Sequence, residues 1–226
     1  MLESLGALFP APRPRYVYRM TDAEHDAWLV DLDGTLYTAR WVKLAMAAEL
    51  ALFGWSALKT LRQFRHDHEA LREEQSAGRA LALTHASPFA GQLARTADAL
   101  GLPVAQVERV VQSWMFERPG KWIGRFPRRA LLAELRAFKA KGGLAALVSD
   151  YPAERKIDAL GVRSLFDVIV ANGEAHGPRR LKPDPEGYLH AAELLKVDPA
   201  RCLVIGDRDD ADGEAARAAK MSFRLV

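Results

Sequence analysis

The sequence predicts an α/β protein whose parallel sheet is interrupted by one large helical insertion. Short apolar runs of strand length recur along the chain and, in its second half, alternate with segments that carry apolar residues at helical spacing. Such alternation is typical of a parallel sheet covered by helices on both faces. The interval 38–125 predicts the insertion, because it is too long for a loop and has mostly helical patterns.

Five apolar runs are predicted as strands. They span residues 28–30, 144–148, 166–170, 203–205 and 223–226. A helix is predicted over 128–141, because Pro127 suits the first turn of a helix and Gly142 can end one. The sheet and its covering helices therefore account for residues 27–37 and 126–226, which form the predicted core domain.

The insertion 38–125 is predicted to be an all-helical cap. Residues 39–65 form one long apolar-rich pattern, Ser87 and Pro88 begin a second helix that ends at Gly101, and Pro103 begins a third. The stretch 44–58 is apolar almost all round, and we expect it to form the interior of the cap. A dimer interface, a pocket for an apolar substrate and membrane-surface association are the alternatives.

Residues 1–26 are predicted to form an arm, packed on the surface or added as an edge strand. Arginines alternate there with aromatic and aliphatic residues, so a nucleic-acid or membrane contact is the alternative. The segment does not resemble a signal peptide, since Glu3 and several prolines interrupt it. The histidine-containing run 65–69 is predicted to be a solvated helix face rather than a metal site, because residues two apart on a helix diverge.

Composition narrows the class of protein. The chain has 226 residues, of which 49% are hydrophobic and 27% charged, as in soluble globular proteins. The net charge of +3 is small, so we expect no nucleic-acid partner. The lone Cys202 lies in an apolar run, where we expect it to be buried, and it favours a reducing, cytoplasmic location. We expect a monomer or homodimer without a membrane partner.

Acidic and other polar residues follow the predicted strands at or just beyond their ends. These residues are Asp31, Asp33, Gly34 and Thr35 after the first strand, Ser149 and Asp150 after the second, Lys182 before the fourth, and Asp207 and Asp212 after the fourth. Strand ends of a parallel sheet meet at one edge, so the groups can converge. Carboxylates with a hydroxyl and one ammonium suit a hard cation such as Mg²⁺ and a phosphoryl group.

Four of these stretches resemble the motifs of the haloacid dehalogenase-like (HAD) hydrolase superfamily, in the same order. They read "DLDGT", "LVSD", "LKPDP" and "VIGDRDDAD". The resemblance covers about residues 27–226 and implies a Rossmann-like core, with the helical insertion where many members carry a cap. Asp150 departs from the asparagine of many members.

The resemblance also implies a role for each matched residue. Asp31 would be the nucleophile and Asp33 the acid and base, while Lys182 would hold the negative charge of Asp31 and the phosphate. Phosphate binding would involve Gly34, Thr35, Ser149, Asp150 and Lys182. The Mg²⁺ ligands would come from Asp31, the Asp33 backbone carbonyl, Asp207 and Asp212, the last holding a metal-bound water or orienting the lysine.

The sequence therefore predicts a Mg²⁺-dependent phosphatase for a small phosphorylated metabolite, acting through an aspartyl-phosphate. Asp33 favours phosphoester over carbon–halogen chemistry, because an alkoxide leaving group needs a proton and a halide does not. A phosphomutase with the same residues is the alternative. The remaining alternatives are a non-catalytic binding module and a membrane-surface protein on this fold.

Overall fold

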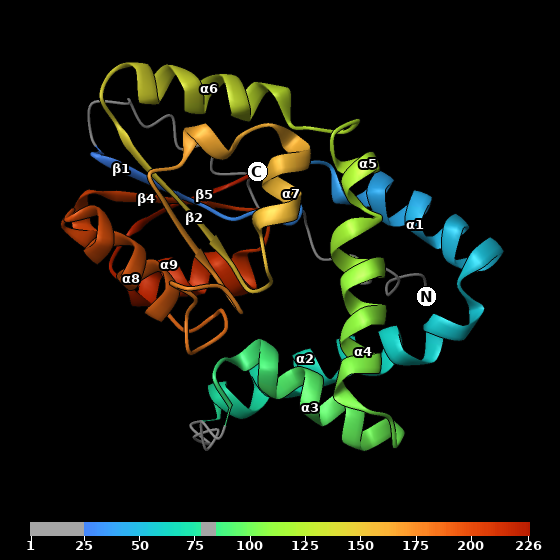
Figure 1. Ribbon diagram of the computed structural model, residues 1–226. Coiled ribbons are helices and arrows are strands. Elements are labelled where there is room, and N and C mark those ends of the chain that lie inside the picture. The colour runs from blue at the N-terminus through green and yellow to red at the C-terminus, as the bar shows by residue number, and fades with distance from the viewer. Residues whose placement is uncertain (1–24, 78–84) are drawn as a thin grey trace, which may run out of the picture.

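The core of the protein is a five-stranded parallel sheet, seen in a computed structural model that describes residues 25–77 and 85–226 (Figure 1). Its strands are β1 (Ala27–Val30), β2 (Leu144–Ser149), β3 (Val168–Ala171), β4 (Cys202–Gly206) and β5 (Ser222–Leu225). Their order in the sheet is β3-β2-β1-β4-β5, which places β1 in the centre. The predicted α/β fold is thus confirmed, while most of the predicted arm, residues 1–24, lies outside the described residues.

Each predicted strand is present, with shifted ends. β3 begins at Val168 opposite Ala146, two residues later than predicted, because the chain before it forms a 3₁₀ turn at Arg163–Leu165. Phe166 is nevertheless buried in the core just before the strand. The last two residues of the predicted arm belong to the core instead, since the backbone N–H of Leu144 donates to the carbonyl of Asp26 at 3.0 Å.

Helices cover both faces of the sheet (Figure 1). The helices are α6 (Arg129–Ala140) and α7 (Glu154–Leu160) on one face and α8 (Glu186–Leu195) and α9 (Glu214–Ala218) on the other. Side chains of a strand alternate between faces, so Trp28 stacks on Phe138 of α6 with ring centroids 4.4 Å apart. Its neighbour Leu29 packs instead with Tyr188 of α8.

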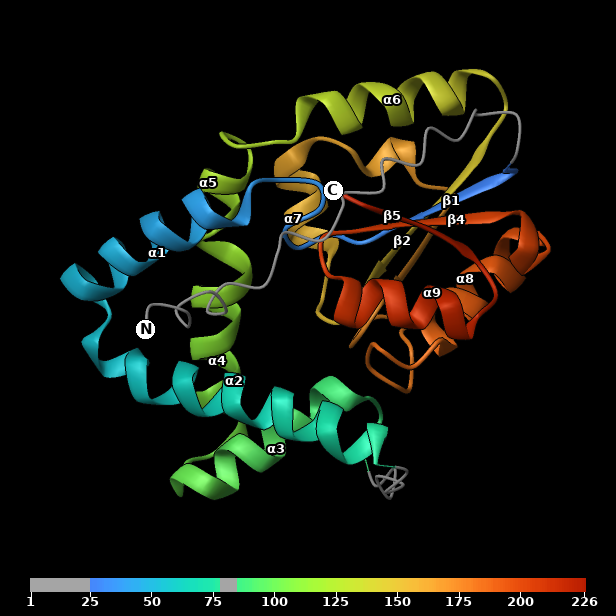
Figure 2. The same cartoon turned by 180° about the vertical axis from the view of Figure 1, so that it is seen from behind.

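The insertion forms a separate group of helices beside the sheet (Figures 1 and 2). They are α1 (Ala39–Phe53), α2 (Trp55–Ser76), α3 (Pro88–Leu100), α4 (Val104–Val111), a π-helical continuation (Gln112–Glu117) and α5 (Gly120–Ile123). The predicted ends of α3 are confirmed, because the Ser87 hydroxyl accepts from the backbone N–H of Ala90 and Gly101 is left-handed. Phe64, Leu93 and Val107 belong to a small apolar core of their own.

The chain leaves and re-enters the core at adjacent points. Tyr37 and Pro127 form an antiparallel bridge. The N–H of Thr38 donates to the carbonyl of Phe126 at 2.9 Å, and that of Arg128 donates to Leu36 at 2.8 Å. The two connections between core and cap therefore run side by side, directly after the loop that carries Asp31.

The long helix expected over 39–65 is broken at Gly54. A Cβ atom at Gly54 would lie 2.5 Å from the indole of Trp114, so only glycine allows the corner to pack this closely. The expected burial of 44–58 in the cap interior is wrong. Leu52, Phe53 and Trp55 are between 71% and 74% exposed.

The charged residue of that stretch, Glu49, faces inward, as do Met46 and Ala57. Glu49 accepts a hydrogen bond from the Trp122 indole at 2.6 Å and pairs with Lys121 at 2.7 Å. A buried carboxylate requires such partners, and they fix the orientation of α1. The apolar side chains on the other side of the helix consequently point outward. No helix in 25–77 or 85–226 has the length and apolarity needed to span a bilayer.

The solvated face predicted for 65–69 is also wrong at two positions. Asp67 is buried and accepts a hydrogen bond from the Thr96 hydroxyl at 2.7 Å. His68 is buried too, and its ring stacks on Tyr151 of the core with centroids 4.4 Å apart. Burial lowers the pKa of His68, so the ring is neutral at pH 7. His68 therefore joins cap to core, whereas His66 is exposed as expected.

Candidate active site

Asp31 is the first residue after the central strand and is held on both sides. Its backbone N–H donates to the carbonyl of Ile205 at 2.9 Å, which continues the pairing with β4. One carboxylate oxygen accepts from the Lys182 ammonium at 2.6 Å and the other accepts from the Thr35 hydroxyl at 2.8 Å. The side chain is thus oriented before any ligand is bound.

Lys182 lies buried between two carboxylates. Besides Asp31, its ammonium contacts Asp212 at 2.8 Å and donates to the carbonyl of Val148 at 3.0 Å. Burial alone would lower the pKa of Lys182, but the carboxylates around it raise that pKa well above the ordinary value. The lysine is therefore a fixed positive charge at pH 7. Tyr188 of α8 supports the arrangement by donating to Asp212 at 2.8 Å.

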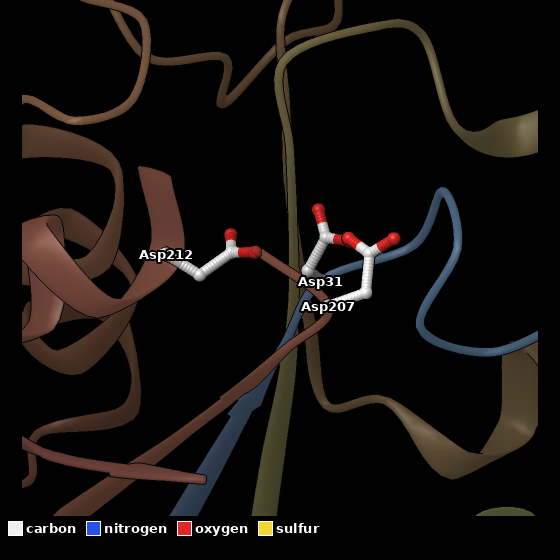
Figure 3. A group of neighbouring side chains, drawn as sticks. All are labelled: Asp31, Asp207 and Asp212. Atoms are coloured by element: carbon white, nitrogen blue, oxygen red, sulfur yellow. The ribbon is translucent and has the colours of Figure 1, made fainter. Parts of the chain in front are cut away.

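Three carboxylates converge at the carboxyl ends of β1 and β4. Asp31, Asp207 and Asp212 each offer an oxygen atom, and these atoms lie within 4.8 Å of one another (Figure 3). Gly34 makes room for Asp207, because a Cβ atom there would lie 1.9 Å from a carboxylate oxygen. Its φ of +96° also favours glycine. The glycine of "DLDGT" is thus required by backbone geometry and by close approach.

The charge of this cluster suits a cation. Burial raises the pKa of Asp31 to about 7 against the lowering effect of Lys182, and the charge of Asp212 adds to the rise. Burial and Asp212 raise the pKa of Asp207 as well. Among residues 25–77 and 85–226, Lys182 is the one ammonium in contact with this cluster, while Arg208 and Lys43 act on Asp207 from further away. Oxygen ligands without sulfur or imidazole are those that a hard divalent cation prefers, and the residues fit such an ion.

The carboxylate of Asp33 is directed to different partners. It accepts from the Lys156 ammonium at 2.8 and 2.6 Å and from the Tyr37 hydroxyl. Burial alone would raise the pKa of Asp33, but Lys156 and Tyr37 together lower it below the ordinary value. Asp33 is therefore ionised, and only its backbone could be directed at the cluster.

Four hydrogen-bond partners of the site were missed by sequence reasoning: Tyr37, Tyr188, Lys156 and Arg128. Lys156 of α7 is buried, although lysine is rarely buried without a partner. A signal existed, since Lys156 falls on the apolar stripe of Ala153, Ile157 and Leu160. Arg128 was missed as well, and it donates from Nε and Nη2 to the carbonyl of Gly34 at 3.1 and 2.9 Å. No local pattern distinguishes Arg128 from other surface arginines.

The predicted phosphate-binding residues surround Asp31 in different ways. The Ser149 hydroxyl accepts from the backbone N–H of Tyr151 at 3.2 Å and keeps its own hydrogen for another acceptor. The Thr35 hydroxyl is already used by Asp31. Asp150 accepts from the backbone N–H of Lys182 at 3.1 Å. The Asp150 side chain acts here as an acceptor, so the backbone N–H of Asp150 is the group that could serve a phosphoryl oxygen.

Comparison with known sequences connects the site to a family. The model of the haloacid dehalogenase-like hydrolases matches residues 25–220. The chain is 40% identical over 84 residues to the chloroplastic 5-amino-6-(5-phospho-D-ribitylamino)uracil phosphatase of Arabidopsis thaliana, which is 36% of this chain and 21% of that protein. It is 38% identical over 95 residues to a phosphoglycolate phosphatase of Aquifex aeolicus, covering 41% and 43%. These matches span less than half of each relative's length.

Solved structures agree with this assignment at the level of the fold. A dehalogenase superposes with a TM-score of 0.61 at 16% identity, covering 92% of this chain and 86% of that one. L-2-haloacid dehalogenase of Xanthobacter autotrophicus gives 0.58 at 21% identity, covering 89% and 77%. The family match extends over most of the chain and includes every strand except the last. The protein belongs to the haloacid dehalogenase-like hydrolase family.

Proposed function

We propose that the protein is a Mg²⁺-dependent phosphatase that hydrolyses a small phosphorylated metabolite through an aspartyl-phosphate. The observation that carries the proposal is that two aspartates close together in the sequence lie in different environments. Asp31 faces Lys182 and the acidic cluster, whereas Asp33, two residues later, is held by Lys156. Carboxylates in different environments can take different chemical roles.

The acid–base residue favours phosphoester chemistry within this family. Both dehalogenases and phosphatases are similar to the chain. A phosphoester hydrolase must protonate an oxygen leaving group, and Asp33 supplies a carboxyl group for that step. The curated relatives named above are phosphatases, similar to this chain over 84 and 95 residues.

The first chemical step would be attack by Asp31 on phosphorus. A new O–P bond forms at the Asp31 carboxylate while the bond from phosphorus to the leaving oxygen breaks, and Asp33 gives that oxygen a proton. Lys182 would balance charge on Asp31 and the phosphoryl group. The hydroxyl of Ser149 would donate to a phosphoryl oxygen. Asp31, the Asp33 carbonyl, Asp207 and Asp212 would hold Mg²⁺, which would supply positive charge to offset the negative charge of the phosphoryl group.

The second step would regenerate the enzyme. Asp33, now ionised, would remove a proton from water as that water attacks the phosphoryl group and releases Asp31. The pairing of Asp33 with Lys156 corresponds to this ionised form. The contacts of Asp33 in this structure are thus those expected for its role as a base. To act as an acid in the first step, Asp33 must be protonated in the substrate complex.

A panel of phosphorylated metabolites tests the proposal. Purified protein with Mg²⁺ should release inorganic phosphate from at least one of them, and Asp31→Asn should abolish the release. Chloride release from 2-chloropropionate without phosphatase activity would overturn the proposal in favour of a dehalogenase. Transfer of the phosphoryl group to another position of the substrate, without free phosphate, would show a phosphomutase instead.

A further inference from the structure

The peptide groups next to Lys182 are bonded to the cap. The Nε of Arg72 in α2 donates to the carbonyl of Lys182 at 2.7 Å. The side-chain oxygen of Gln75 accepts from the backbone N–H of Leu181 at 2.8 Å. Positions 72 and 75 are three residues apart, so they share one face of the helix. One face of α2 therefore contacts the backbone of both Leu181 and Lys182.

Arg72 is an unusual residue to find at such a contact. Its side chain is 8% exposed, and its only carboxylate contact among the described residues is Glu69 at 3.2 Å, which is 60% exposed. A buried cation carries a desolvation cost, which the nearby charge of Asp210 offsets in part. The guanidinium is nevertheless directed at a neutral carbonyl, that of the lysine that contacts Asp31. The arrangement indicates a role in placing that lysine.

A second route of hydrogen bonds joins the cap to the backbone N–H of Lys182. The backbone N–H of Phe89, in the first turn of α3, donates to the Asn172 side chain at 3.0 Å. Asn172 in turn donates to the carbonyl of Asp150 at 3.1 Å, and the Asp150 carboxylate accepts from the N–H of Lys182 at 3.1 Å. Two cap helices therefore end their hydrogen-bond chains on a single residue.

We propose that Arg72 and Gln75 are positioning residues, which couple the seating of the cap on the core to the placement of the Lys182 ammonium beside Asp31. The proposal rests on the function proposed above, in which that ammonium balances the charge of the nucleophile. The ammonium lies 2.6 Å from Asp31, so a backbone shift at Lys182 moves it out of contact. When the cap is not packed against the core in this way, the ammonium would no longer align the phosphoryl group with Asp31, and turnover of the substrate would be slow.

Hydrogen–deuterium exchange of the metal-free protein tests the coupling without any catalysis. Arg72→Ala and Gln75→Met should each speed exchange at the amides of Leu181 and Lys182, while the β1 and β4 amides remain protected. Gln75→Glu keeps an oxygen acceptor and should restore protection at Leu181. Arg62→Ala, an exposed arginine of the same helix, is the matched control and should change nothing. Wild-type exchange at 181–182 in both Arg72→Ala and Gln75→Met would overturn the proposal.

Kinetics with p-nitrophenyl phosphate and Mg²⁺ give the second measurement. Arg72→Ala should lower kcat about 10- to 100-fold, because misplacing a catalytic group by about 1 Å has effects of that size, with little change in KM. Arg72→Lys, which keeps the charge and one donor, should recover part of kcat. A KM increase at unchanged kcat would contradict positioning and indicate substrate contact.

The two measurements separate this inference from the proposed function. A wild-type protein that hydrolyses no phosphoester would remove the proposed function, and the exchange experiment would still decide whether the cap orders Lys182. An active wild type with normal kcat in Arg72→Ala and Gln75→Met would remove the positioning role alone. If Arg72→Ala does not fold, Arg72→Lys and Gln75→Met decide the question.

Discussion

The ammonium of Lys156 lies 2.6 and 2.8 Å from the two carboxylate oxygens of Asp33, and the side chain of Lys156 is 6% exposed. A lysine on α7, more than a hundred residues further along the chain, thus stabilises the ionised form of Asp33, the proposed acid–base residue. This contact leads to the first of four predictions.

Lys156→Met should move the acidic limb of the pH–rate profile to higher pH. Lys156 lowers the pKa of Asp33, so in the wild type the carboxylate needed to activate water persists to lower pH. Without the ammonium the pKa of Asp33 rises, and less of it is ionised at a given acidic pH. Steady-state rates across the pH range, at saturating Mg²⁺ that would keep Asp31 ionised, measure the shift. Lys59→Met, at an exposed lysine of α2, is the control, and an unmoved limb in Lys156→Met would contradict the prediction.

Gly34→Ala should weaken the binding of a divalent cation. The new methyl group would lie 1.9 Å from the Asp207 carboxylate, so Asp207 must move away from the cluster. We expect a loss of about 10- to 100-fold in Mg²⁺ or Mn²⁺ affinity, as for changes that misorient metal ligands. Titration calorimetry or Mn²⁺ spectroscopy measures the affinity directly.

Gly101→Ala separates this steric effect from backbone strain. Gly101 also has positive φ, at 63°, but no atom lies within 4 Å of its absent Cβ. Both variants should lose about 1–3 kcal/mol of unfolding free energy from strain. Only Gly34→Ala should lose metal affinity. Equal affinities in the two variants would show that Asp207 does not depend on the glycine.

Two phenylalanines of the cap should differ sharply in their effect on stability. Phe64 is fully buried in the cap core, so Phe64→Ala should lower the unfolding free energy by about 3–5 kcal/mol. Phe53 is 74% exposed, so Phe53→Ala should change it by no more than about 0.5 kcal/mol. Urea unfolding of both variants compares them. A large loss from Phe53→Ala would mean that this side chain is covered in solution.

Cys202 should resist alkylation in the folded protein. Burial raises the pKa of its thiol to about 11, so at pH 8 only about one thiol in a thousand is the reactive thiolate. Iodoacetamide at pH 8 should therefore leave the native protein unmodified and modify it once after denaturation, as mass spectrometry would show. Rapid modification of the native protein would contradict the buried position of the thiol.

Sequence reasoning succeeded where the signal was local. Asp31 follows an apolar run, Gly34 and Thr35 follow Asp31, and three of the four motifs stand at a strand end, whereas Lys182 lies in the loop between β3 and α8. Parallel strands bring their carboxyl ends to one edge of the sheet, so sequence order was enough to predict that Asp31 and Asp207 would lie together, while Lys182 was identified through its motif. The structure places these side chains in one cluster.

The errors occurred where burial depended on a neighbour. Helical periodicity shows that a helix has an apolar side, but it does not show which side meets another element. In α1 Glu49 turns toward Lys121 and Trp122, whereas Leu52 and Phe53 are exposed. In α2 the core residue Tyr151 covers His68, which the local pattern had indicated as solvated.

The sequence by itself determined the fold class, the helical insertion and the residues at the strand ends, because spacing within short segments specifies strands, helices and the groups that follow them. Only the tertiary structure decided what those residues contact. Lys156 reaches Asp33, Arg128 reaches Gly34, and Arg72 reaches the carbonyl of Lys182, all across separations of more than ninety residues. Such pairs form because each buried charge must find a partner when the layers pack together, and that partner is chosen by three-dimensional proximity rather than by distance along the chain.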